Sequence, residues 1–87
     1  MTFPEYPGTV LKVGSTGNDV LIMQDCIDTI IEKYPFYNQI AGDGIFGNET
    51  KMAVESFQGL VGLEKDGVIG NKTWNAVLSL ANFLSNS

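Results

Sequence analysis

The chain has 87 residues, with 5 basic and 10 acidic side chains that give a net charge of −5 at pH 7. Hydrophobic residues make up 44% of it and charged residues 17%, which excludes an acidic disordered segment and indicates one domain with one core. The sequence contains no histidine and a single cysteine, Cys26. It therefore lacks the residues for a Ser-His or Cys-His nucleophile pair, an internal disulfide or a thiolate metal cluster, and we expect no metal and no cofactor.

The charge and hydropathy patterns exclude two classes of partner. The chain is acidic and its basic residues are scattered, so it offers no basic surface for nucleic acid. The longest apolar run in the first predicted helix is Val20 to Met23, far shorter than the about 20 residues that a membrane span requires. Residues 1–5 have no basic side chain, so they do not form the start of a signal peptide, and export is expected to depend on a parent chain or a phage lysis system.

Three helices are predicted in chain order. Residues 1–10 are rich in proline and glycine and are expected to form an extended lead-in, whereas residues 85–87 form a short tail. Thr16 is expected to cap the first helix, and Pro35 is expected to end it. The apolar positions that recur with helical spacing are Val20, Met23, Ile27, Ile30, Ile31 and Tyr34, then Thr50, Ala53, Val54, Phe57, Leu60 and Val61, and finally Trp74, Val77, Leu78, Leu80, Ala81 and Leu84. These stripes predict an all-α, compact three-helix bundle over residues 11–84.

An internal repeat connects the second and third helices. Residues 43–57 match residues 66–80 at eight of fifteen positions. Each copy reads Asp-Gly-x-x-Gly-Asn and continues into a helix, so a tight turn precedes both helices. Because neither copy is large enough to bury its helix alone, we expect the two turns to lie close together. The spacing of possible ligands around Asp43 and Asp66 does not match a calcium-binding loop, and the two carboxylates are interpreted as turn formers.

The same residues support a resemblance to a known family. The stretch from Leu11 to Val20, followed by Met23-Gln24, the two Asp-Gly-x-x-Gly turns, Phe57-Gln58 and Thr73-Trp74, resembles the peptidoglycan-binding domain of bacterial and phage cell-wall hydrolases. The resemblance implies a non-catalytic module that binds the glycan strand or the stem peptide of peptidoglycan and anchors an attached enzyme at the cell wall or outside the cell. We expect the module to be a monomer. Asn48 and Asn71 stand where members often have proline, and we expect them to cap their helices instead.

The chemistry of peptidoglycan suggests which residues contact it. Sugar rings offer apolar faces to aromatic side chains, whereas their acetamido groups and the stem peptides require hydrogen-bonding groups. Gln24 falls inside an apolar stripe and is predicted to pin a loop, while Gln58 lies at the edge of its stripe and is predicted to touch ligand. For Phe46 and Trp74 a core position is the favoured interpretation. The candidate binding residues are Tyr37, Phe46, Gln58, Asp43, Asp66 and Trp74.

Two alternatives belong to other functional classes. An acidic helical adaptor would dock a partner protein through Leu21, Ile22 and Phe83, which lie off the core stripes. A small glycosidase would use Asp43 and Asp66 as its acid and base. The second alternative is the less favoured, because turn formation already accounts for both carboxylates.

Overall fold

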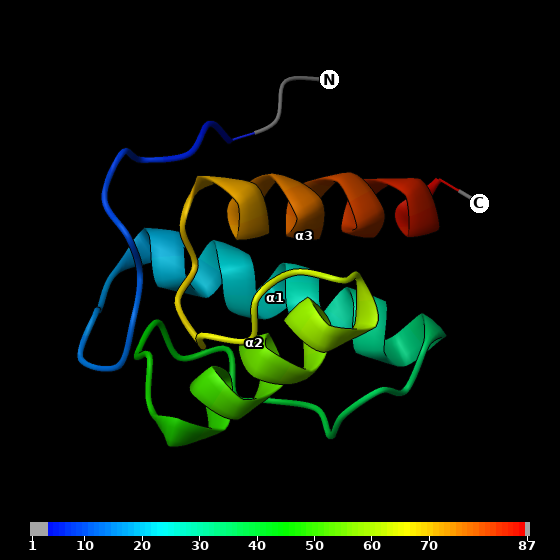
Figure 1. The fold of residues 1–87 in the computed structure, drawn as a ribbon, viewed down its shortest axis with the longest axis horizontal. Coiled ribbons are helices and arrows are strands. Elements are labelled where there is room, and N and C mark those ends of the chain that lie inside the picture. The colour runs from blue at the N-terminus through cyan, green and yellow to red at the C-terminus, as the bar shows by residue number, and fades with distance from the viewer. Residues whose placement is uncertain (1–3, 87) are drawn as a thin grey trace.

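The fold consists of three α-helices and the segments that return the chain between them. In this computed structural model, which describes residues 4–86, the helices are α1 (Asn18–Lys33), α2 (Asn48–Leu60) and α3 (Asn71–Ser85). Within those residues there is no strand, and two isolated antiparallel bridges join Leu11 to Ile69 and Thr16 to Ile45. The predicted all-α, three-helix architecture is confirmed. All three helices begin at the same end of the molecule, so residues 34–47 and 61–70 carry the chain back to that end (Figure 1).

The helix boundaries confirm one predicted signal and correct another. α1 ends at Lys33, and its C-cap residue Tyr34 is already extended, because Pro35 disfavours a helical conformation in the residue before it. The N-cap positions are the glycines that precede each helix, and no side chain in the described part of the chain caps them. The predicted caps are therefore wrong: Thr16 pairs with Ile45 in a bridge, while Asn48 and Asn71 are the first helical residues.

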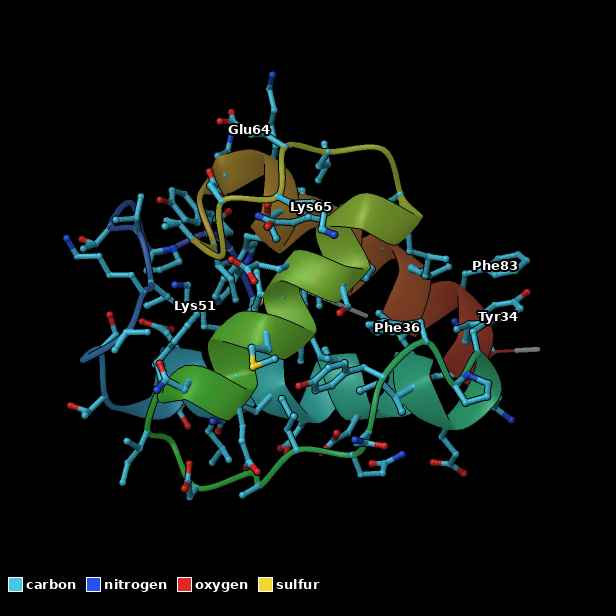
Figure 2. The ribbon with its side chains drawn as sticks, turned by 60° about the horizontal axis from the view of Figure 1, so that its bottom comes forward. Tyr34, Phe36, Lys51, Glu64, Lys65 and Phe83 are labelled. Carbon is cyan, nitrogen blue, oxygen red and sulfur yellow. The ribbon has the colours of Figure 1, made fainter. Side chains whose placement is uncertain are left out.

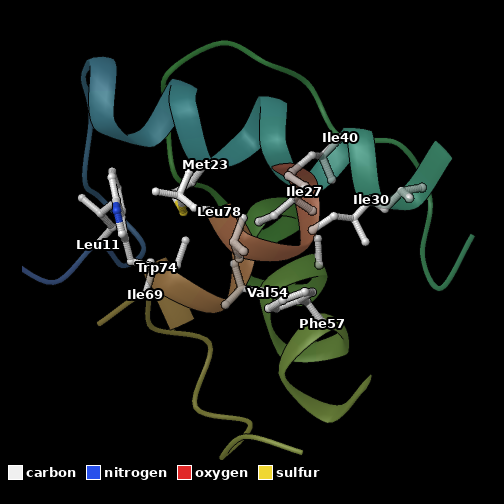
Figure 3. Packing of buried hydrophobic residues seen from close by; sticks show 14 of the residues in the cluster. Leu11, Met23, Ile27, Ile30, Ile40, Val54, Phe57, Ile69, Trp74 and Leu78 are labelled. Atoms are coloured by element: carbon white, nitrogen blue, oxygen red, sulfur yellow. The ribbon is translucent and has the colours of Figure 1, made fainter. Parts of the chain in front are cut away.

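The core lies between the three helices and is completed by residues of the returning segments. Ile27 and Ile30 of α1, Phe57 of α2 and Trp74 of α3 have no exposed surface (Figure 3). Outside the helices, the buried hydrophobic residues of the described segment 4–86 are Leu11, Ile40, Phe46 and Ile69. The predicted stripes are thus confirmed over most of their length.

The stripes fail at the helix ends. Tyr34 is 53% exposed, Leu60 51% and Val61 38%. Tyr34 and Val61 are C-cap residues that lie just past the last helical turn, so they no longer follow the helical face that carries the stripe.

The lead-in covers one side of α3 (Figure 1). The ring of Tyr6 packs edge-on against Trp74, with 6.0 Å between ring centroids. The indole Nε1 of Trp74 donates a hydrogen bond of 3.2 Å to the carbonyl oxygen of Pro4. Residues of the lead-in therefore complete the cover of a core side chain. None of the helices in the described part of the chain has the length and apolarity needed to cross a membrane.

Candidate functional site

The segment from Leu11 to Gly17 connects the two repeated turns. We call residues 43–47 the first corner and residues 66–70 the second corner. Leu11 exchanges two backbone hydrogen bonds with Ile69 of the second corner, at 3.0 and 2.8 Å. Farther along, the N–H of Phe46 donates to the carbonyl oxygen of Ser15 at 2.9 Å, and the N–H of Gly17 donates to that of Gly44 at 2.9 Å. The two corners are therefore neighbours at the end where the helices begin, as the repeat predicts (Figure 1).

Gln24 of α1 holds the first corner in place. Its side-chain oxygen accepts a hydrogen bond from the N–H of Gly44 at 2.9 Å. Its amide nitrogen donates to the carbonyl oxygen of Ile45 at 2.9 Å, to the Thr50 hydroxyl at 3.1 Å and to Asp43 Oδ1 at 3.3 Å. The N–H of Ile45 donates to the same Asp43 oxygen at 3.0 Å. The prediction that Gln24 pins a loop is confirmed.

Gln58 of α2 holds the second corner with the same set of bonds. Its oxygen accepts from the N–H of Gly67 at 3.0 Å, and its nitrogen donates to the Val68 carbonyl oxygen, the Thr73 hydroxyl and Asp66 Oδ1 at 3.0, 3.1 and 2.8 Å. The N–H of Val68 donates to Asp66 Oδ1 at 3.0 Å. Gln58 is 1% exposed, so its place at the edge of the apolar stripe does not make it a surface residue, although it contributes to the lining of the groove at the second corner. The returning segment 61–70 covers that edge and turns Gln58 into a pin like Gln24.

A second offset in the sequence carries the signal for this role. Val20 and Gln24 recur 34 residues later as Val54 and Gln58, whereas the repeat of the corners has an offset of 23 residues. In α3, the position four residues after Val77 is Ala81, which holds neither of the two corners. Glutamine thus occupies this position in the two helices, α1 and α2, whose side chains hold a corner.

The aspartates of the two corners are exposed and ionised. The N–H of Ile45 and the side chain of Gln24 lower the pKa of Asp43, and the N–H of Val68 and the side chain of Gln58 lower the pKa of Asp66. A glycosidase requires one carboxyl group whose pKa is raised, so that it carries a proton to the leaving group. These two carboxylates have the opposite property, which argues against the acid and base roles.

The aromatic candidates lie mostly inside the molecule. Phe46 is 1% exposed and Trp74 is fully buried, as the core interpretation favours, so their ring faces are not on the surface. Tyr37 is half-buried and packs against the core from the segment that follows α1. Tyr34 and Phe83 are exposed at the other end of the molecule, where α1 and α3 end (Figure 2).

Each corner borders a groove, and the two grooves are built from equivalent positions. The groove at the second corner has a volume of about 590 Å³ and the one at the first corner about 210 Å³. Their equivalent lining residues are Asp66, Val68, Gly70, Asn71, Lys72 and Thr73 in the second and Asp43, Ile45, Gly47, Asn48, Glu49 and Thr50 in the first. The larger groove falls within the size range of small-molecule sites.

The remaining candidate sites are weaker. Burial raises the pKa of the Cys26 thiol, and the charge of Asp25 raises it further, so this cysteine is a poor nucleophile. Among residues 4–86, no three side chains of Asp, Glu, Cys or His come together in a way that could hold a metal ion. Phe83 is 66% exposed as the adaptor hypothesis requires, but Leu21 and Ile22 are half-buried and Ile22 packs against the core, so their predicted exposure is wrong.

The described residues offer a groove at each corner, and the Asp43 and Asp66 carboxylates beside the grooves have lowered pKa values, an arrangement that suits a binding module, and comparisons with known proteins agree. Residues 16–77 match the family model described as putative peptidoglycan binding domain. The chain belongs to this family of peptidoglycan-binding domains, which are non-catalytic modules that occur beside the catalytic domains of cell-wall hydrolases.

Individual relatives support this assignment. The chain is 40% identical over 76 residues to the zinc D-Ala-D-Ala carboxypeptidase of Streptomyces albus G and 37% identical over 65 residues to a spore cortex-lytic enzyme of Halalkalibacterium halodurans. These alignments cover 86% and 75% of this chain but 28% and 18% of the relatives, so the chain spans less than a third of either enzyme. The crystal structure of the SleB N-terminal domain has the same fold, with a TM-score of 0.74 and 30% identity over 87% of this chain and 97% of that one.

Proposed function

We propose that this chain binds bacterial cell-wall peptidoglycan without altering it and holds an attached enzyme on the wall. The observation that carries the proposal is the family match over residues 16–77, together with a fold shared with the SleB N-terminal domain. The two relatives are named as a D-Ala-D-Ala carboxypeptidase and a spore cortex-lytic enzyme, and each is more than three times as long as the matched region. A catalytic domain elsewhere in a parent chain, action at the cell wall or outside the cell, and a monomeric state belong to the same proposal.

The binding surface in this proposal is the end that carries the two corners. The buried glutamines fix the backbone of both corners before a ligand arrives, so little conformational entropy is lost on binding. Asp43 and Asp66 present ionised carboxylates at this surface, and both line grooves. Tyr37 is half-buried and follows the far end of α1, so as a ligand contact it would lie away from the two corners and not on the surface that they form.

Sedimentation with insoluble peptidoglycan tests the proposed function. We expect the chain to pellet with purified peptidoglycan and to stay in solution with cellulose, an insoluble glycan without stem peptides. The control variant Phe83→Ser changes the exposed residue that the adaptor hypothesis requires, so it should pellet like the wild type. Recovery of the wild-type chain in the supernatant with several types of peptidoglycan would refute the proposal.

A further inference from the structure

The two grooves differ in charge although they have the same origin. Lys72 lines the second groove at the position that Glu49 occupies in the first. Glu64 also lines the second groove, where the first has Ala41. The repeat therefore provides one groove in which the charged side chains are all carboxylates and another that combines carboxylates with an ammonium group.

The charges of the second groove are available to a ligand. Glu64, Asp66 and Lys72 are exposed, and Glu64 projects from the outer side of the 61–70 segment (Figure 2). The hydrogen bonds that Gln58 and the N–H of Val68 donate to the Asp66 side chain both end on Oδ1, so the second carboxylate oxygen can accept a bond from a ligand. The N-terminus of α3, which adds partial positive charge, lies on the same side of the groove as Lys72.

The lining of the second groove fits a peptide better than a sugar chain. Protein sites for sugar rings generally use aromatic faces, and none of the described residues that line this groove is aromatic. The stem peptides of peptidoglycan are short, and they carry carboxylates together with the amino group of a diamino acid. Such a ligand presents both charges at once, whereas an uncharged sugar residue presents neither.

Resting on the proposed function, we propose that the second groove is the recognition site of this domain for the stem peptide. A free amino group of the peptide binds at Asp66 and Glu64, and a peptide carboxylate binds at Lys72. In the first groove, Glu49 repels a carboxylate from the equivalent position, so the repeat leaves a single site for the peptide. Lys72 is the specificity-determining residue in this arrangement.

The test exchanges the charges that distinguish the two grooves. The probe is a synthetic stem tetrapeptide with a free diamino-acid amine and a free C-terminal carboxylate, titrated into the chain by calorimetry. We expect K72E to weaken binding about tenfold, because it removes one partly exposed ion pair and adds a repulsion. The matched variant E49K lies in the other groove and should bind within about twofold of the wild type. A C-terminally amidated peptide should bind to the wild type about as weakly as the free peptide binds to K72Q, because both changes remove the ion pair without adding a repulsion, and the loss should be smaller than that of K72E.

Two control measurements separate the possible failures. Lys72 is exposed, so K72E should unfold at the temperature of the wild type, and K72Q offers a milder change at the same position. Equal affinity of wild type, K72Q and K72E for the peptide would overturn this inference, as would equally tight binding of glycan strands stripped of peptide. If the wild type still sediments with whole peptidoglycan in that case, the proposed function stands and only the groove assignment falls. If the wild type does not sediment, both fall.

Discussion

Gln24 and Gln58 occupy core positions with polar side chains, and each satisfies its amide group with the backbone and side chains of one corner. No buried side-chain nitrogen or oxygen in the described part of the chain lacks a hydrogen-bond partner. A buried amide that is fully bonded fixes one loop conformation, whereas an apolar residue there would leave several loop groups unpaired. At the scale of single residues, these two glutamines therefore determine the shape of the surface that carries the grooves.

The first prediction concerns the stability contributed by Gln58. Replacing it with leucine keeps most of the volume but leaves the N–H of Gly67 and the carbonyl oxygen of Val68 without their partner. We expect the free energy of unfolding in urea, followed by circular dichroism, to fall by roughly 2 to 4 kcal/mol. Gln39→Leu is the matched control, because Gln39 is exposed and makes only a long bond of 3.5 Å, and it should change stability by less than about 0.5 kcal/mol. Equal effects of the two variants would contradict the pinning role.

The second prediction concerns acid. The pKa values of Asp43 and Asp66 are lower in the folded chain than their ordinary value of 3.8, so the unfolded chain binds protons first as the pH falls. Their contribution to stability is complete above that value and is lost as the pH drops through the folded-state pKa values. Burial raises the pKa of Asp28, so the contribution of that residue to stability increases as the pH falls, opposite to that of Asp43 and Asp66.

The double variant D43N/D66N would test whether the two carboxylates cause the loss of stability in acid. Asparagine keeps an acceptor oxygen at each corner but has no charge to lose, so this variant should show a flatter decline in stability than the wild type between about pH 5 and pH 2. Urea denaturation at several pH values provides the measurement. Parallel curves for wild type and variant would show that the two carboxylates do not contribute to acid sensitivity.

At the scale of elements, the corners depend on glycines that hold positive φ angles. Gly44 has φ +75°, and a Cβ atom there would lie 3.2 Å from the backbone oxygen of Gly17, which cannot move without disturbing the start of α1. Gly8 has φ +87°, but a Cβ atom there would meet nothing within 4 Å. Alanine would therefore be strained by the positive φ angle at both sites, but only at Gly44 would its Cβ atom also crowd a neighbouring backbone atom.

The third prediction compares alanine at these two glycines. Gly8→Ala should lower the unfolding free energy by about 1 kcal/mol from the positive φ angle alone. Gly44→Ala adds the collision with Gly17 and should lower it by about 2 kcal/mol or more. Thermal and urea unfolding of the two variants side by side provide the measurement, and equal losses would show that the close packing of the first corner against Gly17 is unimportant.

The elements that the sequence predicted well are those determined by local pattern. Apolar residues spaced three and four apart mark each helix, and Pro35 ends α1 through a steric effect on its neighbour. The repeat reveals both corners because Asp-Gly turns form from adjacent residues. The burial of Gln58 could not be derived from its angle on a helical wheel, because that angle does not show that residues 61–70 pass over it. The charges of the second groove depend likewise on a tertiary fold that places Glu64 and Lys72 around one space.

At the scale of the whole molecule, the start of the chain joins elements that are distant in sequence. Leu11 pairs with Ile69, and the residues up to Gly17 pair with the first corner, so one extended segment connects both corners. Upstream of it, Pro4 and Tyr6 contact Trp74 of α3. The sequence pattern marks residues 1–10 only as an extended lead-in, because a single Tyr-Trp contact across many residues has no periodic signature.

The fourth prediction tests whether this lead-in stabilises the module. Tyr6→Ala removes the ring that packs edge-on against Trp74, so the free energy of unfolding should fall by about 1 to 2 kcal/mol. Trp74 is the one tryptophan of the chain, and its fluorescence should shift to longer wavelength as water reaches the indole. Phe83→Ala serves as the control, because a side chain that is 66% exposed should change neither stability by more than about 0.5 kcal/mol nor the emission maximum. If Tyr6→Ala changes neither the free energy of unfolding nor the emission maximum, the lead-in is not part of the folded unit. Removal of residues 1–10 should then yield an equally stable domain.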